Sequence, residues 1–119
     1  QMWSRRYGGS GDDRAAAVAV DSSGAAVLAG FFQNTVDFGA GPVPSAGLSD
    51  IFVAKLSSAG DYVWSHAFGG TGSEAASGVA VDAAGRVAVT GAFQGSVPFG
   101  GTVLTSAGLS DVFLLLLGP

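Results

Sequence analysis

The sequence repeats itself once, at a fixed spacing of 61 residues that needs no gap. When residues 1–58 are laid over residues 62–119, roughly two fifths of the positions are identical, which marks a repeat architecture. In such proteins one supersecondary unit cannot bury its apolar surface alone and stacks on its neighbours. We therefore treat residues 1–119 as a single segment of two repeats, about 1–61 and about 62–119. The clearest matches are Trp3-Ser4 with Trp64-Ser65, Val18–Asp21 with Val79–Asp82, and Ser45-Ala46-Gly47-Leu48-Ser49-Asp50 with Ser106-Ala107-Gly108-Leu109-Ser110-Asp111.

Composition narrows the classes of protein to which the chain can belong. Apolar residues make up 48% and charged residues only 12%, about half the roughly 25% of an average globular protein. Much of the chain must therefore be buried or face a partner. A net charge of −4 argues against nucleic acid, and the lack of cysteine excludes disulfides and thiolate metal sites. The longest purely apolar run, Val112–Leu117, is too short to span a membrane, and no signal peptide is visible.

Short apolar runs bounded by turn residues predict strands throughout and no helix. The second and third strands of each repeat are joined by a long, glycine-containing connection, so we expect them to extend outward beyond the sheet. Met2–Tyr7 matches Tyr62–Phe68, the outer strand that follows the turn between the two copies, and is also predicted to be a strand. The expected strands are Ala16–Val20, Ala25–Phe32 and Asp50–Leu56 in the first repeat, Tyr62–Phe68 after the turn between the repeats, and Ser77–Val81, Arg86–Phe93 and Asp111–Leu117 in the second repeat.

Several of these strands are apolar on both faces, most clearly Phe113–Leu117. A half-exposed antiparallel strand alternates apolar and polar residues, so this pattern predicts sheets that are covered on both sides. The four-stranded blades of a β-propeller are covered in that way, because each lies between two others. The fold class predicted is therefore all-β, a β-propeller with two four-stranded blades per chain. The alternative is a monomeric β-sandwich of two sheets, with Met2–Tyr7 folded back on its own chain.

The repeats resemble the bacterial repeat family named for seven-bladed β-propellers (SBBP-type). The resemblance covers nearly the whole chain. It implies a four-stranded blade in proteins that are mostly secreted or attached to the cell surface, usually without catalytic residues. Members of that family normally carry many repeats in one chain, whereas this chain carries two. The residues that carry the resemblance are Gly8-Gly9-Ser10-Gly11-Asp12-Asp13, Val18–Gly24 and Leu28-Ala29-Gly30, with Gly69–Glu74, Val79–Gly85 and Val89-Thr90-Gly91 in the second copy.

Two blades cannot close a ring, which needs roughly four to eight. Each end of the pair would expose an apolar sheet face, so we expect the ring to be completed by other copies of the chain. Three copies would give six blades and four copies eight. The chain starts with an outer strand and ends without one, which predicts strand exchange between subunits. The pairing residues expected are Met2, Trp3, Arg5 and Tyr7 of one subunit and Val112, Phe113, Leu114, Leu115 and Leu116 of the next.

No constellation of residues indicates catalysis. The one histidine, His66, lies on an outer strand where the first repeat has Arg5, so a solvated surface position is expected. No Gly-x-Ser-x-Gly turn is present. The dipeptides Asp12-Asp13 and Ser73-Glu74, which occupy matching places in the two repeats, lack the alternating pattern of a calcium loop, so neither a metal nor a cofactor is expected. Turn formation explains Asp21 and Asp82, and entry into the third strand explains Asp50 and Asp111.

The expected function is therefore that of a non-catalytic binding or scaffold module. Loops on a rigid scaffold commonly carry recognition, and here the longer loops gather at one end of the strands. A glycan or a protein is the ligand class that such loops would bind. The alternative is a purely structural two-blade piece, excised or engineered, that has no ligand of its own. The candidate ligand-binding residues are Asp12, Asp13, Arg14, Gln33, Asn34, Ser73, Glu74 and Gln94.

Overall fold

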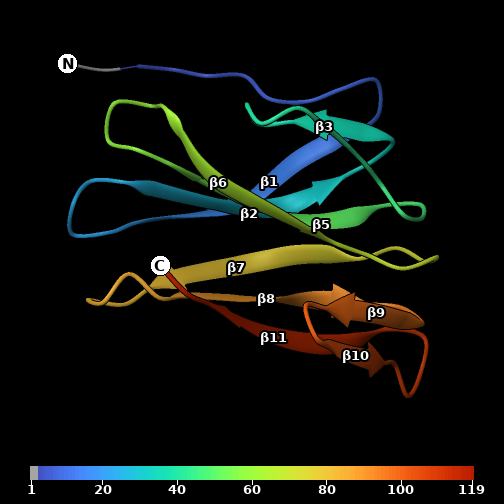
Figure 1. Ribbon diagram of the computed structural model, residues 1–119. Helices are drawn as coiled ribbons and strands as arrows, with labels where there is room; N and C mark the ends of the chain where they lie inside the picture. The colour runs from blue at the N-terminus through green and yellow to red at the C-terminus, as the bar shows by residue number, and fades with distance from the viewer. Residues whose placement is uncertain (1–2) are drawn as a thin grey trace.

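The computed structural model describes residues 3–119 as an all-β protein built from two packed sheets (Figure 1). Helices are absent from this range, so it holds no helical span for a bilayer. The strands, in chain order, are β1 (Asp13–Val20), β2 (Ala26–Phe32), β3 (Thr35–Asp37), β4 (Pro42–Pro44), β5 (Asp50–Leu56), β6 (Tyr62–Phe68), β7 (Ala75–Val81), β8 (Val87–Phe93), β9 (Ser96–Phe99), β10 (Thr102–Thr105) and β11 (Asp111–Leu117).

Each repeat forms one antiparallel sheet with a short ribbon inserted into it. The first sheet has the order β1-β2-β5-β6, and the second has the order β11-β8-β7. The ribbons β3-β4 and β9-β10 each occupy the connection between the second and third strands of their repeat. The second sheet therefore has one strand fewer, and β11 is its free edge. Figure 1 shows the first sheet above the second, with the N-terminal segment on the outer side of the first.

The predicted strands are confirmed to within a few residues at each end, and β5, β6 and β11 have the predicted bounds. One detail of the prediction is wrong. The connections form separate ribbons rather than continuations of the long strands, because Asn34 and Gly95 turn the chain with positive φ values of 62° and 68°. Residues 3–7 of the predicted strand Met2–Tyr7 form no strand within the single chain, so the predicted pairing with another subunit stays a prediction. Met2 itself lies outside the described residues.

The turns between the first two strands of each repeat are held by an aspartate, as predicted. Asp21 Oδ1 accepts hydrogen bonds from the backbone N–H groups of Ser23 and Ala25 at 2.9 and 3.0 Å. Asp82 Oδ1 does the same for Ala84 and Arg86 in the second repeat, both at 2.9 Å. A glycine with positive φ completes each turn, at Gly24 and Gly85. The duplicated sequence thus produces duplicated local structure.

The main core lies between the two sheets. One face of the first sheet, on β2 and β5, meets a face of the second sheet on β7, β8 and β11. Trp64 and Phe68 of β6 pack against the same cluster. Face-to-face packing occurs both in sandwiches and between neighbouring propeller blades. The buried members are Val27, Ala29, Ile51 and Val53 from the first sheet, and Ala76, Val87, Val89, Phe93, Val97, Phe99 and Phe113 from the second repeat.

A smaller core lies on the opposite face of the first sheet. Phe32 and Phe52 pack there with Phe38, and the half-buried ring of Tyr7 covers Phe38 at a centroid distance of 5.4 Å. The N-terminal segment therefore covers one end of this face. The rest of it is open, and Val18 and Val20 of β1 are 61% and 65% exposed.

The outward face of the second sheet is apolar and uncovered in the single chain. Val112, Leu114 and Leu116 alternate along β11 and are 80%, 67% and 71% exposed. Their equivalents in the first repeat are Ile51, Val53 and Lys55, of which the first two are completely buried against the second sheet. The same structural position is thus core in one repeat and surface in the other.

Truncation of a side chain in the main core tests the packing between the sheets. Replacing Ile51 with alanine is expected to lower the free energy of unfolding by about 2–5 kcal/mol, because it leaves a cavity between the sheets. Urea denaturation measures this loss. The control Val103→Ala removes an exposed side chain of β10 and should change the free energy of unfolding by no more than about 0.5 kcal/mol. Equal urea midpoints for both variants would contradict this account of the core.

Candidate functional site

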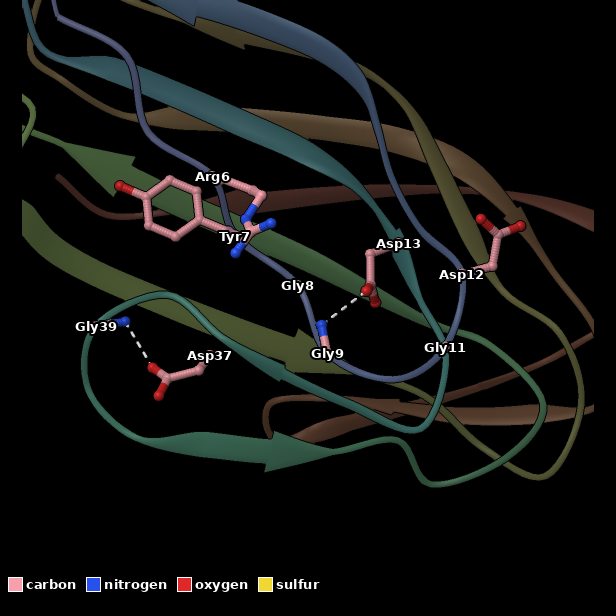
Figure 2. A pocket seen from close by; sticks show the side chains of 9 residues that line it. All are labelled: Arg6, Tyr7, Gly8, Gly9, Gly11, Asp12, Asp13, Asp37 and Gly39. Carbon is pink, nitrogen blue, oxygen red and sulfur yellow. Dashed lines mark hydrogen bonds between the residues drawn. The ribbon is translucent and has the colours of Figure 1, made fainter.

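A cleft lies beside several of the predicted ligand residues, where the N-terminal segment turns into β1 (Figure 2). We name it the Gly8–Asp13 cleft after the loop that forms its floor. Its volume is about 820 Å³, and it is open to solvent. Polar backbone and carboxylate groups dominate its walls, so it suits a polar or main-chain ligand better than an apolar one. The lining residues are Arg6, Tyr7, Gly8, Gly9, Gly11, Asp12, Asp13, Asp37 and Gly39.

Backbone crowding shapes the floor of the cleft. A Cβ atom at Gly9 would clash with the carbonyl oxygen of Thr35, so only glycine lets the loop pass this close to β3. The Gly9 N–H donates a hydrogen bond of 2.9 Å to Asp13 Oδ2, which Figure 2 shows as a dashed line. The other carboxylate oxygen of Asp13, Oδ1, is buried without a hydrogen-bond partner. Asp13 therefore holds the loop in place and retains one acceptor.

The remaining carboxylates of the cleft are already engaged. Asp37 Oδ1 accepts hydrogen bonds from the N–H groups of Gly39 and Gly41 at 2.8 and 3.2 Å, closing the β3-β4 hairpin. Asp12 forms an ion pair with Arg14 at 3.3 Å, in which both side chains are largely exposed. An exposed pair of this kind contributes little to stability. Among the described residues, no three His, Asp or Glu side chains are grouped to hold a metal ion.

The eight predicted ligand residues fall into two groups, one per repeat. Around the cleft, Asp12 accepts the Gln33 N–H through its carbonyl, and its own N–H faces Gln33 Oε1 at 3.4 Å. Asn34 turns the chain through a positive φ, and Gly95 does the same at the equivalent position of the second repeat. In the second repeat, Gln94 and Ser73 lie near Gly72. Nothing in residues 3–119 brings the two groups into one site.

Glu74 corrects the sequence interpretation. It was expected on an open loop, but its side chain is 1% exposed. Glu74 Oε1 accepts the Gly70 N–H at 3.0 Å, as Asp13 does for Gly9, while Glu74 Oε2 is buried without a partner. The carboxylate lies beside that of Asp50, which is 3% exposed and also carries an unpartnered oxygen, Oδ1. Glu74 is therefore not available to an external ligand in this chain.

Burial perturbs both carboxylates of this pair. Desolvation raises the pKa of Asp50 above its usual value, although the Ala46 N–H partly offsets the effect. Desolvation also raises the pKa of Glu74, and the nearby charge of Asp50 adds to the shift. A perturbed carboxylate pair can mark a catalytic centre. Both carboxylates of this pair are buried, and their hydrogen bonds to the Ala46 and Gly70 N–H groups fix two loops.

The pair makes stability depend on pH. Because the folded-state pKa values are raised, the folded protein binds more protons than the unfolded chain, and stability falls as pH rises above the unfolded values near 4. Glu74→Gln keeps the acceptor for Gly70 and removes the charge. We expect a higher unfolding free energy at pH 7 and a smaller change at pH 4, measured by urea denaturation. The neighbouring Ser73→Ala, which removes no titrating group, should leave the pH slope unchanged, whereas equal slopes for Glu74→Gln and the parent would contradict this account.

Asp12 and Asp13 of the cleft were predicted as ligand residues, whereas Arg6, Tyr7 and Asp37, which also line it, were not. The burial of Asp50 was not predicted either, since Asp50 and Asp111 were interpreted only as residues at the entry to a strand. The available signal was the identical block Ser45–Asp50 and Ser106–Asp111, the longest identity between the repeats. His66 is exposed as predicted, and its ring stacks between Trp64 and Phe68. In the comparisons with known proteins, no family model matches this sequence. No curated protein matches it either.

Proposed function

We propose that this chain is a non-catalytic β-propeller subunit that acts as a binding scaffold. In this proposal each sheet is one blade, and three or four copies complete a ring of six or eight blades. The resemblance to the SBBP-type repeat is consistent with this assignment. The face of the ring that carries the longer loops would then bind a glycan or a protein, with every site repeated three or four times.

The observation that carries the proposal is which face of each sheet lies against the other sheet. The first sheet contacts the second through Ile51 and Val53, whereas the equivalent residues of the second sheet, Val112 and Leu114, point away from the first. Unlike faces are therefore in contact, as in a stack that advances by one unit per repeat. A two-fold sandwich would pair like faces and leave nothing unmatched. Here one face of each kind remains open, with Val112, Leu114 and Leu116 at one end and Val18 and Val20 at the other.

The free edge of the second sheet supports the same arrangement. Tyr7 lies on Phe38 at 5.4 Å, as Phe68 of β6 lies on Phe99 at 5.6 Å. Residues 3–7 thus occupy the position of an outer strand that belongs to a preceding blade. A second copy would supply that blade through the unpaired edge of β11. Transferring the β5-β6 register by one repeat pairs Tyr7 with Val112, Arg6 with Phe113, Arg5 with Leu114, Ser4 with Leu115, and Trp3 with Leu116.

The loops at the edge of the cleft are the recognition surface of the proposal. Asp12, Arg14 and Gln33 present charged and amide groups there, and Gln94 is exposed at the equivalent loop of the second repeat. Planar amides and paired charges can hydrogen-bond sugar hydroxyls or peptide groups. Each such site would bind weakly, and a ring would multiply it into avidity.

A charge on the open sheet face should prevent assembly. The parent is expected to show three or four times the 11.7 kDa mass of one chain in light scattering or native mass spectrometry. Leu114→Glu should reduce that mass to one chain, because the carboxylate would be buried against the next subunit. Val103→Glu is the control, since Val103 is 62% exposed on β10 and its equivalent in the first repeat, Pro42, is exposed rather than buried against the second sheet. A parent that remains a single chain at high micromolar concentration would refute the ring.

Ligand binding is tested with the assembled protein on a glycan array and on a panel of immobilised extracellular proteins. A double variant, Asp12→Ala with Gln33→Ala, should lose the signal of the parent by roughly tenfold or more. The same double variant should keep the mass of the parent. Silence of the parent across both panels would contradict the binding role and would favour a purely structural ring.

A further inference from the structure

The two copies of the six-residue block have the same internal structure. In both, the backbone N–H of the first serine donates a hydrogen bond to a carbonyl oxygen of the preceding turn. The acceptor is Asn34 O at 2.6 Å for Ser45 and Gly95 O at 2.8 Å for Ser106. In both, the aspartate Oδ2 accepts the alanine N–H, at 2.7 Å in Ser45–Asp50 and 2.8 Å in Ser106–Asp111. Each block is therefore a preformed loop whose shape depends on its own hydrogen bonds.

The first block is seated in the loop of the second repeat. The Leu48 N–H donates to Gly72 O at 3.2 Å, and the Glu74 N–H donates to Ser49 O at 3.0 Å. Ser49 forms a parallel bridge with Ser73, and its side chain is 8% exposed. These main-chain bonds join the two repeats at the end of the strands.

The second block has the same shape and no such seat. Ser110 is exposed, and Leu109 is 91% exposed. In Figure 1 this block follows β10 on the outer side of the second sheet, whereas residues 8–13 lie beyond the first sheet. The two repeats of the chain lie between them, so the block of one chain is not placed to reach the cleft of the same chain.

The Gly8–Asp13 cleft is the repeat equivalent of the seat. Gly70 and Glu74 in the occupied seat correspond to Gly9 and Asp13 in the cleft. The bond from the Gly70 N–H to Glu74 is 3.0 Å long, and that from the Gly9 N–H to Asp13 is 2.9 Å. Both glycines pass so close to a backbone carbonyl of the following ribbon that a Cβ would clash. The chain therefore has two equivalent receiving surfaces, and only the one in the second repeat is occupied by a loop of the same chain.

We propose that the Gly8–Asp13 cleft is a self-recognition site that receives the loop Ser106–Asp111 of a second copy. The expected contacts are those of the occupied seat, with each block residue moved 61 positions forward and each seat residue moved 61 positions back. The Leu109 N–H donates to Gly11 O, and the Asp13 N–H donates to Ser110 O. This inference rests on the ring proposed above, and it adds a polar, shape-specific contact to the apolar contact between the sheets. In this arrangement Asp12 faces Ser110, as Ser73 faces Ser49 in the occupied seat, and Gln33 stays at the edge of the contact.

Glycine at the centre of the block supports this assignment. A Cβ at Gly47 would clash with Gly70 O, so the seated block requires glycine there. At Gly108 an added Cβ would meet nothing closer than Asp111 Oδ1 at 4.0 Å, and its φ is not positive. The single chain gives no steric reason for glycine at position 108. Seating against Gly9 O of a second copy gives one.

The first experiment uses that difference. Gly108→Ala should weaken assembly of the full chain roughly tenfold or more in sedimentation analysis, while the melting temperature of the dissociated chain stays unchanged. Gly101→Ala, also at an exposed glycine with open space around it, is the matched control and should assemble like the parent. Gly47→Ala should destabilise the single chain. Assembly of Gly108→Ala with the affinity of the parent would overturn the inference.

The second experiment traps the contact. The parent has no cysteine, so Asp12→Cys with Ser110→Cys introduces the only two thiols, at positions equivalent to the bridged pair Ser73 and Ser49. Under mild oxidation this variant should form disulfide-linked multimers, because facing residues of neighbouring strands lie within disulfide reach. Ser49→Cys with Ser73→Cys is the control and should form a disulfide within one chain.

The outcomes separate the two proposals. Multimers linked through positions 12 and 110 support the inference. An assembly of the expected mass that does not cross-link, while the control oxidises fully, refutes the seat and leaves the ring standing. A parent that is a single chain in solution refutes both.

Discussion

Burial of apolar sheet faces governs this structure, because the chain has too few charges to cover two sheets on both sides. The inner face of the first sheet is buried against the second sheet, and the main core lies in that contact. The stack places unlike faces together. A chain of two repeats arranged in this sense always retains one open face of each kind, and the exposed leucines of β11 are a direct result. We connect both the proposed assembly and the proposed scaffold role to this geometry.

A second layer of the structure depends on close backbone approach. Glycines at positions 9, 47 and 70 bring main chains within hydrogen-bonding distance where any side chain would collide. Carboxylates then hold these loops, with Glu74 and Asp50 on the inside of the chain and Asp13 at its end. Burial raises the pKa of the inner pair and costs some stability at neutral pH. In return, the loops at the end of the strands have one defined shape.

The long strands could be predicted from the sequence, since each is a short apolar run bounded by turn residues, as at the turn Asp21–Gly24. The conformation of residues 3–7 could not, because strand formation there depends on a ladder partner that the described part of the chain does not supply. The burial of Glu74 was also missed. Its equivalent, Asp13, is part of an open cleft, so the repeat pattern alone does not reveal which copy of a position is enclosed. Duplicated local sequence predicts local structure, whereas burial depends on what stacks against it.

One difference between the repeats bears on how copies could meet. Lys55 on β5 forms an ion pair with Asp21 at 3.5 Å, and both side chains are mostly shielded. At the matching position β11 carries Leu116. A lysine on the open face would be hydrated before association and would have to shed that water on contact, at a cost that a partly matched partner rarely recovers. The ion pair of Lys55 with Asp21 forms within each molecule as it folds. Because position 116 is leucine, the open face of β11 has no charged group there that would lose its water on contact with another copy.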